Sequence, residues 1–314
     1  FCAKYAAWKK ASGKKVVLPQ EREPGKELFI DWVGDTLACV TDSETNTIRE
    51  AHFFVTTIGD SSYPFVEAFP DETQENWIQG HLDALEWYGG VPKIFVPDNC
   101  KTAVKHASLY NPELNHAYRN LALHYGVAVI PARIVKPRDK PSVESGVGWL
   151  ETWLLEWLSG RSYHSFAALN QDIKERVAEL SLRPFQHRDG SRSSNFIALD
   201  KPALRALPKD TFEFFYTKLV SRVPNNYHVE WRSFYYSVPY MYYDKPVTVH
   251  AYAKRIEIFL RNGERIAVHP RRFTGRRYVT ITEHMPPNHQ AVVSMRSFDG
   301  RYYRQKAAGI GQYT

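Results

Sequence analysis

The sequence is poor in cysteine and lacks long apolar runs. Its 314 residues include three cysteines, Cys2, Cys39 and Cys100, which lie far apart and in no paired spacing. Neither a disulfide framework nor a cysteine-based zinc site is therefore expected. No apolar run approaches the roughly 20 residues that cross a bilayer, and the start of the chain lacks the pattern of a secretory signal. We expect a cytoplasmic protein with reduced thiols and no membrane partner.

Four local motifs of common enzyme classes are also absent. The sequence contains no GxxxxGK[ST] loop, no GxGxxG after a strand, no GxSxG elbow and no HExxH. These absences argue against nucleotide hydrolysis, dinucleotide binding, acyl transfer and zincin chemistry. The twelve histidines are scattered, and we interpret His81, His106, His116 and His124 as core or surface residues rather than soft-metal ligands.

Charge is unevenly distributed along the chain. Residues 1–200 contain 22 Lys and Arg against 26 Asp and Glu, a net charge of −4, whereas residues 201–314 contain 19 against 8, a net charge of +11. The basic third also carries aromatic stretches such as WRSFYY and YMYY. This combination favours a nucleic-acid surface over a membrane patch; the alternative is a solvated basic face without a partner.

Hydrophobic periodicity predicts a mixed α/β domain in the first half of the chain. An antiparallel meander is predicted first, in which residues 37–40 and 52–58 are both neighbours of a strand at 27–32. Then follow, in order, a helix, a strand, a helix and a strand, at residues 71–90, 93–99, 112–126 and 127–132. This alternation implies parallel neighbours joined by crossover helices, and the whole amounts to a mixed five-stranded sheet.

A small β module is predicted at residues 216–280. Its apolar and polar residues alternate, and Asn262-Gly263 between apolar runs is a two-residue hairpin signal. Several short strands of this kind are typical of an SH3-like barrel. A cluster of four arginines follows the hairpin and could neutralise DNA phosphates: Arg271, Arg272, Arg276 and Arg277. We interpret the aromatic residues of these strands as core rather than as a base-stacking platform.

Three acidic residues lie where such a fold can bring them together. Asp31 closes the apolar run of ELFIDW, Asp98 follows that of KIFVP, and Glu144 borders the apolar stripe of a helical stretch. Three converging carboxylates form an all-oxygen site for hard divalent cations. Two such ions about 3.5–4 Å apart activate an oxygen nucleophile and stabilise a leaving oxygen at a phosphodiester. The expected roles are Asp31 bridging both ions, with Asp98 and Glu144 each holding one.

Each acid also has an ordinary structural interpretation. Asp31 can cap a turn with Gly34, Asp98 can be the turn residue of a Pro-Asp-Asn corner, and Glu144 can lie on a helix surface. Taken singly, each ordinary interpretation is the better one. The metal site is favoured because the three occur together in the order strand, strand, helix.

The segments FIDWVGD, VPDNCKTAV and KPSVESGVGWLE resemble the three acidic motifs of retroviral-integrase-type transposases, and most closely those of the IstA-like transposases of the insertion sequence 21 family. The segment SRSSNFIALDKPALRALP resembles the linker after the catalytic core in that family. The resemblance implies an RNase H-like core in which Asp31, Asp98 and Glu144 are the DDE ligands of two Mg²⁺ ions, with Mn²⁺ as a substitute.

The resemblance also implies a function and partners. We expect a bacterial, nucleoid-associated transposase that cleaves the 3′ ends of an insertion sequence and transfers them into target DNA. Its partners would be the terminal inverted repeats, the target DNA, a second or further copy of the chain, and an AAA+ ATPase helper of the IstB type. The alternatives are an RNase H-like nuclease without strand transfer and a catalytically decayed DNA-binding protein.

The implied organisation has five parts. These are an N-terminal remnant or linker, the RNase H-like core, a helical linker, a DNA-binding β-barrel and a tail, at residues 1–24, 25–160, 161–215, 216–280 and 281–314. The resemblance also implies helix-turn-helix domains before the core, and we expect missing sequence upstream of Phe1. The lead KPSVE departs from the KGKVE-like pattern of the family, but the loop before it stays basic. The candidate DNA contacts in this half are Lys101, Lys136, Arg138 and Lys140.

Overall fold

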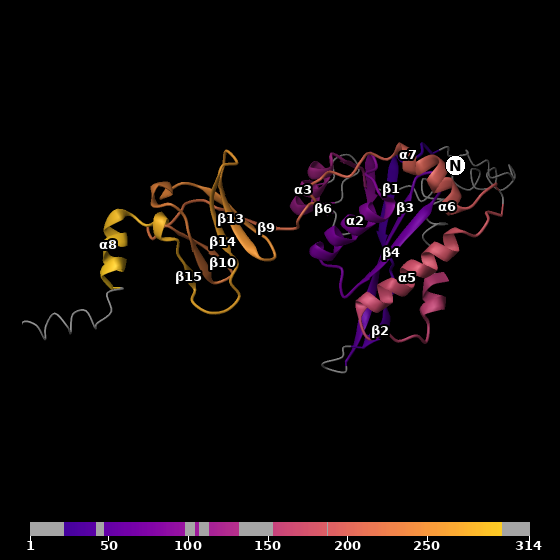
Figure 1. The fold of residues 1–314 in the computed structure, drawn as a ribbon, viewed down its shortest axis with the longest axis horizontal. Coiled ribbons are helices and arrows are strands. Elements are labelled where there is room, and N and C mark those ends of the chain that lie inside the picture. Colours follow the sequence, from indigo (N-terminus) through magenta and orange to yellow (C-terminus); the bar gives the residue numbers. More distant parts are fainter. Residues whose placement is uncertain are drawn as a thin grey trace, which may run out of the picture. The chain divides into compact units, whose positions relative to one another are not determined.

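The computed structural model describes residues 22–41, 47–97, 104–106, 113–131, 153–186 and 188–296. The chain divides into two units, Phe1–Phe212 and Glu213–Thr314. Figure 1 shows a first unit of helices around a sheet and a second unit built mainly of short strands. Among the described helices, none has the length and apolar character needed to cross a membrane.

A mixed sheet organises the first unit. Its strands are β1 (Glu27–Trp32), β2 (Leu37–Thr41), β3 (Ile48–Ile58), β4 (Tyr63–Phe69), β5 (Ile94–Pro97) and β8 (Ala128–Val129). The strand order is β2-β3-β1-β5-β8, and β4 also pairs with β3. Strands β1, β2, β3 and β4 are joined by antiparallel pairing, whereas β5 is parallel to both β1 and β8. The prediction of a mixed α/β core is confirmed, but its sheet has six described strands rather than the predicted five.

The predicted meander is wrong in one respect, because β2 is not a lateral neighbour of β1. Both strands pair with β3, at different stretches of it: Trp32 lies opposite Phe54, and Leu37 lies opposite Ala51. From Trp32 to Leu37 the chain runs five residues, whereas the paired stretch of β3, from Phe54 to Ala51, runs three. The two extra residues lie in the break between β1 and β2. Strand β4, which the periodicity did not indicate, is the third strand of the meander on the far side of β3.

One face of the sheet is covered by helices α2 (Gln74–Tyr88) and α3 (His116–Tyr125). The side chain of Thr73 caps α2, and Gly89, with φ of 68°, ends it, so the predicted helix at residues 71–90 is confirmed. Buried aromatic rings fill this layer, and Trp77 lies 5.3 Å from Phe54 and 6.0 Å from Trp32 between ring centroids. The antiparallel pair β6 (Val104–His106) and β7 (Glu113–Leu114) precedes α3.

The opposite face is covered by helix α5 (Phe166–Ser181) and by the helical residues 153–158. Leu154 and Leu158 are at most 1% exposed and share one apolar cluster with the strand residues Phe53 and Val55. The β3 face toward this cluster is the one opposite to Phe54, since side chains alternate along a strand. Two helical segments therefore pack on the same side of the sheet.

The side chain of Asn170 pairs with the outer edge of the sheet. Ala68 of β4 donates its backbone N–H to Asn170 Oδ1 at 2.7 Å, and Asn170 Nδ2 donates to the Ala68 carbonyl at 3.0 Å. One amide side chain of α5 thus satisfies both backbone groups of an edge-strand residue, in the way that a neighbouring strand would.

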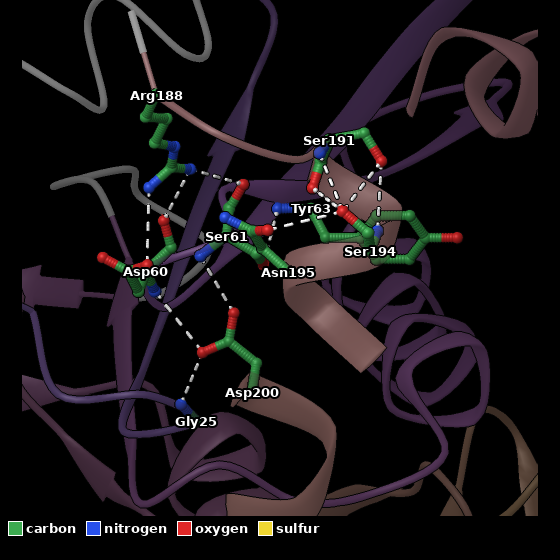
Figure 2. Close-up of polar contacts among 9 residues, drawn as sticks. All are labelled: Gly25, Asp60, Ser61, Tyr63, Arg188, Ser191, Ser194, Asn195 and Asp200. Carbon is green, nitrogen blue, oxygen red and sulfur yellow. Dashed lines mark hydrogen bonds and ion pairs between the residues drawn. The ribbon is translucent and has the colours of Figure 1, made fainter. Parts of the chain in front are cut away.

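A strap of chain after α5 closes the first unit at the beginning of β1. It consists of α6 (Arg192–Asn195), the π-helix η2 (Phe196–Asp200) and α7 (Lys201–Ala203). Asp200 is fully buried, and its carboxylate accepts N–H groups from Gly25 at 2.7 Å, Ser61 at 3.0 Å and Asp60 at 3.4 Å (Figure 2). Arg188 donates to the carbonyl of Asp60 at 3.0 Å in the same view. Asp200 of the strap and Arg188, which precedes the strap, therefore both hold the β3–β4 turn.

The described residues of the second unit form two sheets rather than one closed barrel, which corrects the predicted architecture. One sheet has the order β10-β11-β15 and the other β14-β13-β12-β9. The bounds are β9 (Tyr216–Val220), β10 (His228–Trp231), β11 (Phe234–Ser237), β12 (Val247–Ala251), β13 (Arg255–Leu260), β14 (Arg265–Pro270) and β15 (Tyr278–Val279). Both sheets contribute to one apolar core, which includes Tyr236 and Ile258. The predicted hairpin at Gly263 is confirmed between β13 and β14.

Three histidines are buried around Ser237 in the second unit. His269 donates from Nε2 to the Ser237 carbonyl at 2.6 Å, and His284 Nδ1 lies 2.9 Å from Ser237 Oγ. The third, His228, lies 2.9 Å from Thr280 Oγ1 through its Nε2. Burial, together with the neighbouring histidines, lowers the pKa of His269 to about 4, although its bond to Ser237 opposes the shift.

This cluster predicts acid sensitivity of the second unit. The folded state holds His269 neutral down to about pH 4, whereas the unfolded chain binds a proton below about pH 6.5. Stability from this group is therefore complete above pH 6.5 and is lost as pH falls toward 4, on the order of 3 kcal/mol in total. The protection factors of the β10–β15 amides against hydrogen exchange, corrected for the intrinsic pH dependence of exchange, should fall across this interval.

A glutamine at position 269 keeps a donor for the Ser237 carbonyl but does not titrate. His269→Gln should flatten the pH dependence, and the control His289→Gln, at an exposed histidine, should leave it unchanged. An equal pH dependence in both variants would contradict the assignment to His269.

Candidate active site

Asp31 lies near the end of β1, on the face of the sheet that is covered by α5 and the helical residues 153–158. It is directly opposite Val55 of β3, and cross-strand partners point to the same face of a sheet. Val55 belongs to the apolar cluster with Leu154 and Leu158, whereas the β1 neighbours Ile30 and Trp32 face the α2 side. Asp31 is half-buried. The strand therefore presents this carboxylate at the border of a packed layer, not in its interior.

The predicted ligand Asp98 follows β5 directly. Strand β5 runs parallel to β1, and its last residue, Pro97, pairs with Ile30. Asp98 itself lies outside the described residues, so its role stays a prediction. What the structure establishes is that the strand leading to it is the immediate neighbour of the strand that carries Asp31.

Glu144 also lies outside the described residues, and its role stays a prediction too. The helical residues 153–158 follow it in the chain, and their apolar side chains pack on the face of the sheet to which Asp31 belongs. Trp153 and Trp157 of this segment stack at 6.2 Å, and the Arg176 guanidinium of α5 lies 5.4 and 5.8 Å from their centroids. Leucine packing and this cation–π contact fix the segment against α5.

No group of three possible metal-ligating side chains occurs within the part of the chain that the structure describes. Only Asp31 of the three predicted ligands is in that part. Its chemistry fits the prediction, since a half-buried carboxylate on a strand is an oxygen donor held on a rigid element. The described residues thus include one predicted ligand, Asp31. They also include β5, which leads to Asp98, and the helical residues 153–158, which follow Glu144 in the chain.

The predicted DNA contacts also fall partly outside and partly within the described residues. Lys101, Lys136, Arg138 and Lys140 lie outside the described residues. The four predicted arginines, Arg271, Arg272, Arg276 and Arg277, occupy the loop between β14 and β15, and the last three of them are exposed. Arg271 is half-buried and donates from Nη1 to the Tyr252 carbonyl at 2.7 Å.

Exposed aromatic side chains accompany these arginines, which the sequence interpretation missed. Phe273 is 66% exposed and Tyr278 is 55% exposed. The sequence assigns aromatic residues of small β modules to the core, and this holds for Tyr236. The available signal was the alternation of arginine and aromatic residues in RRFTGRRY, which is also typical of nucleic-acid surfaces.

Known proteins match both units. Residues 207–282 match the family described as Mu transposase, C-terminal domain. Over 291 residues the chain is 39% identical to the putative transposase for insertion sequence IS408 of Burkholderia multivorans, covering 93% of this chain and 55% of that protein. This chain is a homologue of insertion-sequence transposases. It is also 26% identical, over 87% of its length and 68% of the relative, to the transposase for insertion sequence element IS21 of Pseudomonas aeruginosa.

The resemblance to transposases of the insertion sequence 21 family is thereby confirmed. The chain spans about half the length of relatives such as those of IS408, at 55%, and IS1162 of Pseudomonas fluorescens, at 50%. Among solved structures, the HTLV-2 integrase catalytic core domain in complex with magnesium is 14% identical, with 56% of this chain and 98% of that chain covered and a TM-score of 0.40.

Proposed function

We propose that this transposase homologue cuts and joins DNA strands at a site for two divalent cations, with Asp31, Asp98 and Glu144 as ligands. The observation that carries the proposal is the register of β1 and β5. Because Ile30 pairs with Pro97, a continuation of β5 by one residue would set Asp98 beside Asp31, about 4.8 Å away between strands. Two carboxylates at that spacing can share an ion.

Glu144 is proposed as the third ligand because of the helical segment that follows it. That segment is fixed on the same sheet face as Asp31 by buried leucines. Bound Mg²⁺, or Mn²⁺ in its place, would supply an activated oxygen nucleophile and stabilise the leaving oxygen. The protein's part is to hold the carboxylates on strand ends, so that little reorganisation is needed when the ions bind.

The proposed reaction has two steps. Water first attacks a phosphodiester at the element end, its proton is released, and the broken P–O bond leaves a free 3′ hydroxyl. That hydroxyl then attacks a target phosphodiester, so that one P–O bond forms as another breaks. The number of phosphodiester bonds is unchanged in the second step, and no covalent enzyme intermediate is required.

The second unit is proposed to hold the DNA. Its basic loop can neutralise phosphates, and the resulting affinity should fall steeply with salt. Two element ends require two sites, so we expect a dimer or larger assembly on DNA. The resemblance, and no feature of the described residues, supplies the expectation of an AAA+ helper of the IstB type.

A joining assay tests the proposal. The chain is incubated with Mg²⁺, a labelled oligonucleotide that carries a free 3′ hydroxyl, and supercoiled plasmid. Covalent transfer of the label to the plasmid supports a transposase, whereas nicking without transfer favours the RNase H-like nuclease. Binding of DNA without either product, in both Mg²⁺ and Mn²⁺, would favour the catalytically decayed DNA-binding protein.

A further inference from the structure

The loop of residues 271–277 in the second unit, here called the arginine loop, is anchored at both ends. The backbone N–H of Arg271 donates to the Lys254 carbonyl at 2.8 Å, and that of Arg272 donates to Tyr236 Oη at 3.0 Å. At the other end, Tyr235 donates its N–H to the Arg277 carbonyl at 2.7 Å. A loop fixed in this way presents its side chains from a defined position rather than from a free tether.

Two aromatic rings stand at this loop with most of their surface accessible. Tyr278 is 55% exposed and stacks on Tyr235, with centroids 4.8 Å apart and an interplanar angle of 16°. Phe273 is 66% exposed, and the Arg271 guanidinium lies 4.8 Å from its centroid. Because β15 pairs in parallel with β11 through Tyr278 and Tyr235, the stacked pair is built into a sheet.

Neither ring contributes to the apolar core of the second unit, although Phe and Tyr usually bury most of their area. Exposed aromatic rings between guanidinium groups suit a ligand that is both planar and anionic. Single-stranded DNA has this chemistry, because its bases offer faces for stacking and its phosphates attract arginine. Duplex DNA offers the phosphates, but its base faces are already stacked on one another.

We propose that Tyr278 and Phe273 stack on unpaired DNA bases while the arginine loop holds the adjoining phosphates. This inference rests on the proposed function, since it names the form of DNA that the second unit takes. Strand cleavage leaves a nicked end whose bases can separate from their partners, and such an end is the expected occupant. A protein partner on the same rings is the competing explanation, which the test below separates.

The test compares two DNA forms on the whole chain. Fluorescence anisotropy is measured with a blunt duplex and with the same duplex carrying a short single-stranded 3′ flank, in which one base is replaced by the fluorescent base 2-aminopurine. The parent chain should bind the flanked duplex more tightly and quench 2-aminopurine. Tyr278→Leu should weaken binding of the flanked duplex about 10-fold, abolish quenching, and leave blunt-duplex binding unchanged.

Two matched variants control for side effects. Tyr243→Leu removes a tyrosine of the second unit that is equally exposed, at 54%, and should change neither measurement. Tyr278→Trp preserves a ring and should preserve quenching.

Three results would overturn the inference. The first is an equal affinity of the parent for both DNA forms, which leaves the proposed function intact. The second is self-association of the parent without DNA that Tyr278→Leu abolishes, which would make the rings a protein contact. The third is failure to bind any DNA, which would sink the proposed function as well.

Discussion

Asp31→Asn should abolish Mg²⁺-dependent joining while leaving the protein folded. Asparagine keeps the shape of the side chain at the end of β1 but replaces one negatively charged oxygen with a nitrogen that cannot ligate the cation. Loss of a residue that only supports a metal ligand typically lowers metal affinity or activity about 10- to 100-fold. Loss of a bridging ligand should therefore lower the joining activity at least about 100-fold. The measurement is the joining assay at several Mg²⁺ concentrations.

Asp35→Asn is the matched control. Asp35 is exposed and lies four positions further along the chain, outside β1, so this variant removes the same charge at no proposed ligand. It should retain parental joining. Retention of joining by Asp31→Asn would refute the ligand assignment, whereas DNA binding should be nearly equal in the parent and both variants.

Asp200→Ala should destabilise the first unit strongly. Its carboxylate receives three backbone N–H groups in a site with no exposed surface, and truncation would leave these donors buried without an acceptor. Removing one partner of a buried charged network costs about 3–5 kcal/mol. Urea unfolding, followed by tryptophan fluorescence, should show the midpoint falling accordingly.

Two further variants define the cause. Asp200→Asn keeps one acceptor oxygen. Its free energy of unfolding should fall by roughly half as much as that of Asp200→Ala, because a neutral acceptor makes weaker hydrogen bonds than a carboxylate. Asp210→Ala removes an exposed aspartate ten positions further along the chain, outside the strap, and should change the free energy of unfolding by less than about 0.5 kcal/mol. If Asp200→Ala unfolds at the midpoint of the Asp210→Ala protein, the carboxylate does not hold the turn.

The elements that periodicity predicted are those with one clear apolar face. Strand β1 alternates regularly, and the cap residue Thr73 and the terminal Gly89 fix the ends of α2 through local chemistry. Strand β4 was missed because Pro64, Phe65 and Val66 are buried in succession, so its pattern does not alternate. A proline near the start of an apolar stretch also argues against a strand, although an edge strand tolerates it.

The site was predictable only as far as local sequence determines it. The position of Asp31 at a strand end follows from the apolar run before it, and the adjacency of β1 and β5 follows from the expected parallel pairing. Asp98 and Glu144 stay predictions. The role of Asp200 could not be read from the sequence, because it binds Gly25 across 175 positions of chain. Nor could the exposure of Tyr278, which depends on how two sheets meet.

The pairing of Asn170 with Ala68 bears on how this protein behaves at high concentration. Strand β4 is the outer strand of its sheet, and an uncovered edge is a template onto which another chain can add a strand and begin to aggregate. Because the Asn170 amide already binds both backbone groups of Ala68, another strand cannot pair with β4 at this residue, near the C-terminal end of the strand. The proposed assembly of two or more copies on one DNA molecule would gain from such protection, since an open edge would favour aggregation of the gathered copies.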